Sequence, residues 1–238
     1  MSKETSTRFL IVNADDFGLT TGVNRGIIES YERGIVTSAS LMVRYPATEH
    51  AAEYARAQPG LSLGLHFDVE EWRWCKGKWE PAYRLIDITD ARAVRGEFER
   101  QLTIFEDLLG RPPTHLDSHQ HVHLAEPARS ILRGHAEQLG VPLRNCTAAI
   151  SYHGTFYGQT DEGESFPSGI SEEALVGAFR DLPLGWTEIG CHPGYADGLD
   201  SVYSVEREEE LRVLSSVAVR SALDRSAVQL RSFDDFEI

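Results

Sequence analysis

Short apolar runs alternate with amphipathic stretches along the chain, and this pattern predicts strands that are followed by helices. Runs of strand length and composition occupy 9–13, 36–43, 61–69, 141–144, 186–192 and 228–233. Helical periodicity covers 22–33, 46–57, 91–109, 125–139, 171–182 and 206–223. Strands that alternate with helices from end to end specify a parallel sheet, either open or closed into a barrel.

One further strand is predicted for 115–123, which reads HLDSHQHVH. In an extended segment, its odd positions would place four histidines and an aspartate on one face. A helix is also possible because His115, His119 and His123 are spaced four residues apart. The preceding Pro112-Pro113 favours extended structure, and the glutamate of a helical HExxH zinc site is missing. The alternatives are therefore a metal site and a polar surface strand without a role.

The polar residues of interest follow different predicted strands at their carboxyl ends. They are Asp15, Asp16, His66, His119 and His192. Barrel enzymes assemble their sites at this end, whereas an open sheet would gather them at a switch point. No glycine-rich phosphate loop marks such a point. We therefore expect a distorted β/α barrel that forms a single domain over 1–238.

Composition and charge disfavour some classes of binding partner and indicate where the protein is located. The formal net charge of −14 disfavours nucleic acid and anionic membrane surfaces, which would repel the chain. No stretch has the length and apolarity of a membrane span, and the start lacks a signal-peptide pattern, so a cytoplasmic location is expected. The three cysteines form no CxxC pair and are expected to be reduced thiols.

Two long segments, 70–90 and 145–170, show little periodicity and are expected to be loops. The first contains Trp72, Trp74 and Trp79 among charged residues. Indole rings suit the apolar faces of sugar rings, so this segment is a candidate lid or sugar platform. Tryptophans that plug a barrel mouth or a dimer seam would give the same pattern.

The polar residues at the strand ends suit hydrolysis when they are taken together. A lone histidine such as His66 is often structural, and an Asp-Asp pair is often a turn or a cap. As a group they offer two imidazoles and a carboxylate for a metal with open positions. A second carboxylate and another histidine are left to act as general base and general acid.

Several segments in order resemble the YdjC-like carbohydrate deacetylase family, which is related to the NodB-type polysaccharide deacetylases. They are IVNADDFGLT, GIVTSASLMV, LGLHF, PTHLDSHQHVH, GVPLR and EIGCHPG, and they span nearly the whole chain. The resemblance implies a distorted β/α barrel, a divalent metal, often a homodimer, and removal of acetyl groups from N-acetylated sugars.

The resemblance also implies roles for individual positions. Asp16, His66 and His119 become metal ligands, Asp15 the base and His192 the acid. Arg144 resembles the arginine that steadies the catalytic aspartate. Asp117, His121 and His123 match the family stretch and are expected to lie behind the metal ligands, in contact with them, or at the rim of the substrate site. Zinc suits two imidazoles and a carboxylate, with Mg, Mn, Co or Ni as alternatives.

The chain departs from the family pattern after the GLH motif, where it reads FDVEE instead of a polar, uncharged run. This departure and the unfamiliar loop at 145–170 leave room for a nucleotide-linked sugar, a glycolipid or a small aminosugar in place of a chito-oligosaccharide. The acidic residues could also hold a substrate cation or a product amine. The rival functions are a barrel metal-dependent phosphoesterase and a non-catalytic sugar-binding or metal-binding protein.

Overall fold

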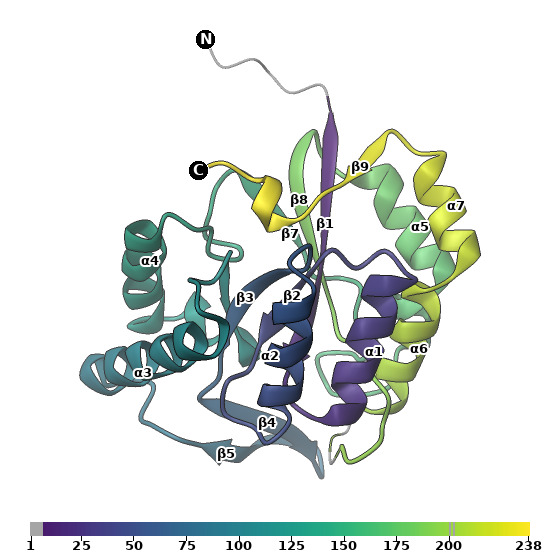
Figure 1. Cartoon of the computed structure of the whole chain (residues 1–238). Coiled ribbons are helices and arrows are strands. Elements are labelled where there is room, and N and C mark those ends of the chain that lie inside the picture. The colour runs from purple at the N-terminus through teal and green to yellow at the C-terminus, as the bar shows by residue number, and fades with distance from the viewer. Residues whose placement is uncertain (1–6, 200, 202) are drawn as a thin grey trace.

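The computed structural model describes residues 7–199, 201 and 203–238, and its centre is a curled sheet of parallel strands (Figure 1). The sheet order is β6-β3-β2-β1-β8-β7, and β9 pairs with β1. The strands are β1 (Arg8–Phe17), β2 (Ser38–Leu41), β3 (Ser62–Phe67), β6 (Leu116–Ser118), β7 (Ile150–His153), β8 (Gly185–Cys191) and β9 (Val228–Leu230). The curled parallel sheet with its outer helices confirms the predicted distorted β/α barrel.

The longest strand, β1, organises the sheet. Its first half pairs with β9 and β8, and its second half pairs with β8 and β2. Residues 10–17 of β1 are all buried, as expected for a strand covered on both faces. Asp15 and Asp16 belong to the end of this strand and do not follow it, because β1 continues beyond the predicted apolar run 9–13.

The helices lie around the outside of the sheet (Figure 1). They are α1 (Thr21–Glu32), α2 (Thr48–Ala57), α3 (Ala91–Leu109), α4 (Ala128–Leu139), α5 (Glu172–Asp181), α6 (Val205–Leu214) and α7 (Val217–Asp224). Thr20, Asp90 and Ser171 cap helix starts through their side chains, and Gly110 and Gly140 end α3 and α4 in the left-handed conformation. Of the helices in the described ranges, none combines the length and apolarity needed to cross a membrane.

The segment 70–90 is not a loop throughout, because its first part forms an antiparallel hairpin. Strands β4 (Glu70–Cys75) and β5 (Lys78–Arg84) pair with each other and lie at the bottom of Figure 1, beyond the carboxyl end of β3. Lys76 and Gly77 both have positive φ, which suits the tight two-residue turn of a twisted hairpin. Its strands are largely solvated, so they lack the continuous apolar runs from which the sequence analysis predicted strands.

The histidine-rich stretch is extended over only part of its length. Strand β6 ends at Ser118, and a 3₁₀ segment, η1 (His119–Leu124), follows. Gln120 and His121 adopt left-handed backbone conformations, with φ of 53° and 51°. The predicted single face of odd positions therefore holds for His115 and Asp117 but ends where the chain turns.

Other boundaries differ from the sequence prediction as well. A strand, β7, lies inside the expected loop 145–170, and 141–144 contributes a single bridge between Leu143 and Leu116. The expected helix 206–223 is two helices, because Ser216 caps a new start at α7. The last strand is short, and a 3₁₀ turn, η3 (Phe233–Asp235), follows it.

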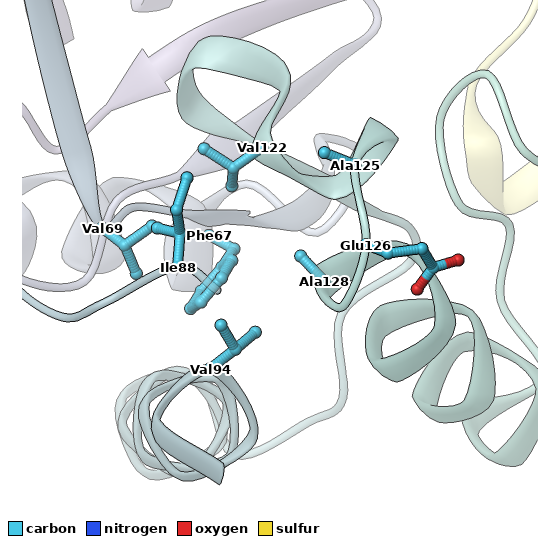
Figure 2. Close-up of a pocket in the computed structure, with 8 residues that line it drawn as sticks. All are labelled: Phe67, Val69, Ile88, Val94, Val122, Ala125, Glu126 and Ala128. Atoms are coloured by element: carbon cyan, nitrogen blue, oxygen red, sulfur yellow. The ribbon is translucent and has the colours of Figure 1, made fainter. Parts of the chain in front are cut away.

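A small apolar cavity lies outside the sheet, against α3 and the start of α4 (Figure 2). Phe67, Val69, Ile88 and Val94 line it, together with Val122, Ala125, Glu126 and Ala128. None of these side chains belongs to the polar residues singled out in the sequence. The cavity is therefore separate from the candidate site.

Candidate metal and catalytic site

Three buried donors from different strands face one another at the carboxyl end of the barrel. Asp16 Oδ1 lies 3.3 Å from His66 Nε2 and 3.1 Å from His119 Nδ1. The three ligand atoms all lie within 4.8 Å of one another. Asp16 Oδ1 is inaccessible to solvent and has no hydrogen-bond partner among the residues that the structure describes. An unsatisfied buried carboxylate oxygen faced by two imidazoles offers the donors that a divalent cation requires.

Each of the two histidines is held by a second carboxylate on its other ring nitrogen. Asp117 Oδ1 lies 2.8 Å from His66 Nδ1, and Glu71 Oε2 lies 2.7 Å from His119 Nε2. Carboxylates in this position fix the orientation and the tautomer of a metal-binding imidazole. Both rings therefore point one nitrogen at Asp16.

Asp16 itself is oriented from α6. Arg207 Nη2 donates to Asp16 Oδ2 at 2.5 Å, so only Oδ1 faces the two histidines. The backbone of Asp16 has a φ of 67°, a left-handed conformation that aspartate tolerates better than most residues. The arginine and the local turn together aim one oxygen into the cluster.

In the metal-free protein, neighbouring opposite charges determine the pKa values of the three donors. Burial acts to lower the pKa of His66, but the carboxylate of Asp117 outweighs it and the pKa rises to about 10. Burial also acts to lower the pKa of His119. The carboxylates of Asp16 and then Glu71 outweigh it and raise this pKa well above its usual value. Burial would raise the pKa of Asp16, yet Arg207 and the histidines hold it well below its usual value. A cation that binds here must therefore displace ring protons.

Asp15 lies beside the cluster and is held by Arg144. The guanidinium donates to both oxygens of Asp15, at 2.6 and 2.7 Å. Arg144 also pairs with Asp117 at 2.8 Å and Glu188 at 2.6 Å, and its side chain is fully buried. Burial raises the pKa of Asp15, but the charge and hydrogen bonds of Arg144 lower it on balance. Asp15 is therefore an ionised carboxylate in a fixed orientation.

His192 follows β8 and approaches Asp15 from the other side. Its Nε2 lies 3.8 Å from Asp15 Oδ2, and its Nδ1 lies 3.9 Å from Glu210 Oε1. The rings of Tyr157 and Tyr203 meet the imidazole edge to face. Burial lowers the pKa of His192 to about 4, so the ring is neutral near pH 7.

Comparison with known proteins places the chain in a family. The YdjC-like protein model matches residues 9–225. The chain belongs to the YdjC-like family. It is 31% identical to a chitooligosaccharide deacetylase of Serratia marcescens, over 96% of this chain and 99% of the relative. It is 33% identical to the protein of the same name from Klebsiella pneumoniae, with the same coverage.

Solved structures share the fold of this YdjC-like chain. A putative cellobiose-phosphate cleavage protein of Enterococcus faecalis matches with a TM-score of 0.76 at 24% identity, over 98% of this chain and 100% of the other. A family 4 carbohydrate esterase from Streptomyces lividans, in complex with acetate, matches with a TM-score of 0.57 at 11% identity, over 94% and 91%. The barrel is therefore common to this YdjC-like protein and to these neighbours.

His121 and His123 do not reach the three-donor cluster of the YdjC-like chain. His123 is buried, and its ring nitrogens lie within hydrogen-bond distance of Ser118 Oγ and the carbonyl oxygen of Arg144. His121 is exposed and packs edge to face against Tyr152. His123 therefore supports the loop that carries Arg144, and His121 lies at the rim.

His115 is also buried, behind the site. Its Nε2 lies 3.0 Å from Ser40 Oγ, which donates to Asp117 Oδ2 at 2.5 Å. The ring stacks on Phe233 with centroids 3.8 Å apart. Gly64 lies below it, where a Cβ would come within 2.4 Å of the His115 ring. Burial lowers the pKa of His115 to about 3, so it acts as a neutral support for Asp117.

The three tryptophans of the predicted sugar platform lie on the hairpin. Trp72 donates to Glu70 at 2.9 Å and is partly buried. Trp74 and Trp79 pack against each other, and Trp79 donates to the carbonyl oxygen of Asp161 at 3.0 Å. These contacts join the hairpin to the loop near 160. They leave Trp79 41% exposed.

Sequence reasoning missed four site residues, namely Glu71, Glu188, Arg207 and Glu210. Glu71 was noticed only as a departure from the family run. Glu188 lies within β8, four residues before His192, where an acidic residue in a buried apolar run was the available signal. Arg207 and Glu210 lie on α6, which has a weakly amphipathic sequence that resembles a solvated helix. Contacts across the fold alone assign them to the site.

A second set of donors, Asp15, His66 and Asp117, also lies close enough for a cation. Arg144 already bonds to both of these carboxylates. A cation there would have to displace a fully buried guanidinium, which is strongly unfavourable. The group around Asp16 is therefore the better metal site.

Proposed function

We propose that this YdjC-like protein is a metal-dependent deacetylase that hydrolyses the acetamide of an N-acetylated amino sugar. The observation that carries the proposal is the unpartnered Asp16 oxygen faced by His66 and His119, beside the ionised Asp15. The two relatives named above are chitooligosaccharide deacetylases, so chito-oligosaccharides are the first substrates to test.

Asp16, His66 and His119 would hold one divalent ion, with zinc favoured and magnesium, manganese, cobalt or nickel as alternatives. Such an ion supplies Lewis-acid chemistry, activating water and polarising a carbonyl oxygen. The residues that it leaves free must move protons and orient the sugar.

Asp15 is proposed as the general base. Arg144 holds both of its oxygens, so the carboxylate cannot rotate away from water beside the metal site. It accepts the proton of the water that attacks the acetamide carbonyl carbon. Arg144 remains as a fixed positive charge beside it.

His192 is proposed as the general acid. The departing amine needs a proton, and His192 is neutral at rest because burial lowers its pKa to about 4. Asp15 lies 3.8 Å away, so the proton taken from water has a short route to His192 Nε2. The imidazole then delivers it to the amine nitrogen as the C–N bond breaks.

Trp72, Trp74 and Trp79 stay candidates for sugar contacts, and the homodimer and the cytoplasmic location stay predictions. For the phosphoesterase alternative, basic residues would be needed to bind phosphate. Arg144 and Arg207, the buried cations of the site, are both already bonded to carboxylates.

The proposal is tested by acetate release from N-acetylglucosamine, chito-oligosaccharides, a nucleotide-linked N-acetyl sugar and an N-acetylated aminosugar antibiotic. We expect release with at least one of them that disappears on chelation and returns with zinc. Phosphate release from p-nitrophenyl phosphate without acetate release from any sugar would reject the proposal.

A further inference from the structure

We infer that Glu71 of the β4–β5 hairpin is a positioning residue for His119 and thereby tunes the affinity of the metal site. This inference rests on the proposed metal site but concerns a residue outside its three donors. The sequence signals Glu71 only as part of the acidic run that replaces the expected uncharged residues.

The geometry places Glu71 on the far side of the imidazole from the metal cluster. Glu71 Oε2 lies 2.7 Å from His119 Nε2, while His119 Nδ1 lies 3.1 Å from Asp16 Oδ1. If Nε2 carries the proton and donates to Glu71, the lone pair of Nδ1 is directed toward Asp16. A charged acceptor on a metal-binding histidine also raises the basicity of the ligating nitrogen.

The backbone around His119 does little to fix the orientation of its ring. His119 opens η1, and the next two residues, Gln120 and His121, are left-handed, so the backbone that carries its ring is irregular. Its partner nevertheless comes from a well-anchored hairpin. Tyr83 of β5 donates to the buried carboxylate of Asp68, and the Tyr45 hydroxyl lies 2.9 Å from that of Tyr83. These contacts attach the hairpin to the rest of the fold and so hold Glu71 beside His119.

The neighbouring acidic residue has a different environment. Glu70 pairs with Arg84 at 2.9 Å and accepts from Trp72, and both contacts lie within the hairpin. Glu70→Gln therefore perturbs the same strand and removes the same charge without touching His119. It is the matched control for Glu71.

The alternative role for Glu71 is to bind the amine of the product. Both of its oxygens already have neighbours, since Oε1 accepts from Gln120 at 3.2 Å and Oε2 faces His119. An amine would have to compete with these contacts, which favours the positioning role.

The experiment is titration of metal-free full-length protein with Zn²⁺ against a chelating dye. The variants are Glu71→Ala, Glu71→Gln and the control Glu70→Gln. We expect Glu71→Ala to raise the zinc Kd about 10–100-fold, the usual cost of losing an outer partner of a ligand. Glu71→Gln keeps a neutral acceptor and should lose less, and Glu70→Gln should match the parent. In Co²⁺-loaded protein, the visible absorption bands should shift in the Glu71 variants only.

An unchanged zinc Kd in a folded Glu71→Ala variant would overturn the inference. An equal loss in Glu70→Gln would do the same, because it would indicate general distortion of the hairpin. So would a change in KM for the acetylated sugar without a change in zinc affinity, which would assign Glu71 to the substrate. None of these results touches the proposed function, which fails separately if the parent protein releases no acetate.

Discussion

Replacement of Arg144 by methionine should be among the most destabilising single changes in the chain. The side chain is fully buried. It donates three charge-assisted hydrogen bonds of 2.6–2.7 Å to Asp15 and Glu188, and it forms an ion pair with Asp117 at 2.8 Å. At about 1.5–3 kcal/mol each, these bonds would exceed the whole stability of many domains if they were summed, so they cannot be additive. Removing one partner of a buried ionic group costs about 3–5 kcal/mol.

The pH dependence of the stability lost in Arg144→Met gives a second check. In the parent protein, Arg144 helps to hold the pKa values of Asp15 and Asp117 below normal. These two carboxylates therefore contribute stability above the pKa of the unfolded chain, and the contribution is lost in acid. Without the guanidinium, burial raises both pKa values, and the folded variant takes up protons as the pH falls. The destabilisation should therefore be larger at pH 8 than at pH 5.

Urea unfolding of Arg144→Met and the parent at both pH values measures the difference. The control is Arg133→Met, since Arg133 pairs with Glu137 on an exposed helix face and should change stability by no more than about 0.5 kcal/mol. A loss below about 1 kcal/mol in Arg144→Met, or the same loss at both pH values, would refute the reasoning.

Four further results are expected. Metal analysis should find that His66→Ala and Asp16→Ala purify without the ion, whereas a full complement of tightly bound metal in either would remove the ligand assignment. His192→Ala should lower kcat about 100-fold or more with unchanged metal content, because the amine loses its proton donor, and normal turnover would exclude that role. Zinc affinity should rise with pH, because the pKa of His66 near 10 and the raised pKa of His119 mean that zinc binding releases protons. Calorimetry in buffers of different ionisation enthalpy would detect this proton release. A zinc affinity that does not change with pH would contradict the prediction. Trp79→Ala should raise KM with kcat nearly unchanged if this exposed indole stacks on the sugar, and unaltered kinetics would restrict Trp79 to packing in the hairpin.

The sequence predicted the architecture well because buried parallel strands carry unmistakable apolar runs. The prediction of a site at the carboxyl ends followed from the barrel, and the structure does bring Asp16, His66 and His119 together there. The hairpin was missed because its solvated strands bear charges on both faces and contain no continuous apolar run.

Local periodicity could not reveal where a polar chain turns. His121 was placed on one face with His119, but the left-handed residues after His119 redirect the backbone. No residue at these positions, such as glycine, announces the turn. Likewise, Arg207 is separated from Asp16 by most of the sequence, and its hydrogen bond to Asp16 exists only when α6 packs against α1. Pairings of this kind depend on tertiary contacts that no local pattern encodes.

The stacking of Phe233 beneath His115 makes the site depend on a part of the sheet that lies away from it. Phe233 supports the ring that contacts Ser40 and, through Ser40, Asp117. Strand β9, which precedes Phe233, pairs with the start of β1, at the opposite end of that strand from Asp15 and Asp16. Local opening of β9 would therefore withdraw the ring beneath His115 and loosen Asp117, and the site would lose order without any change in its own residues.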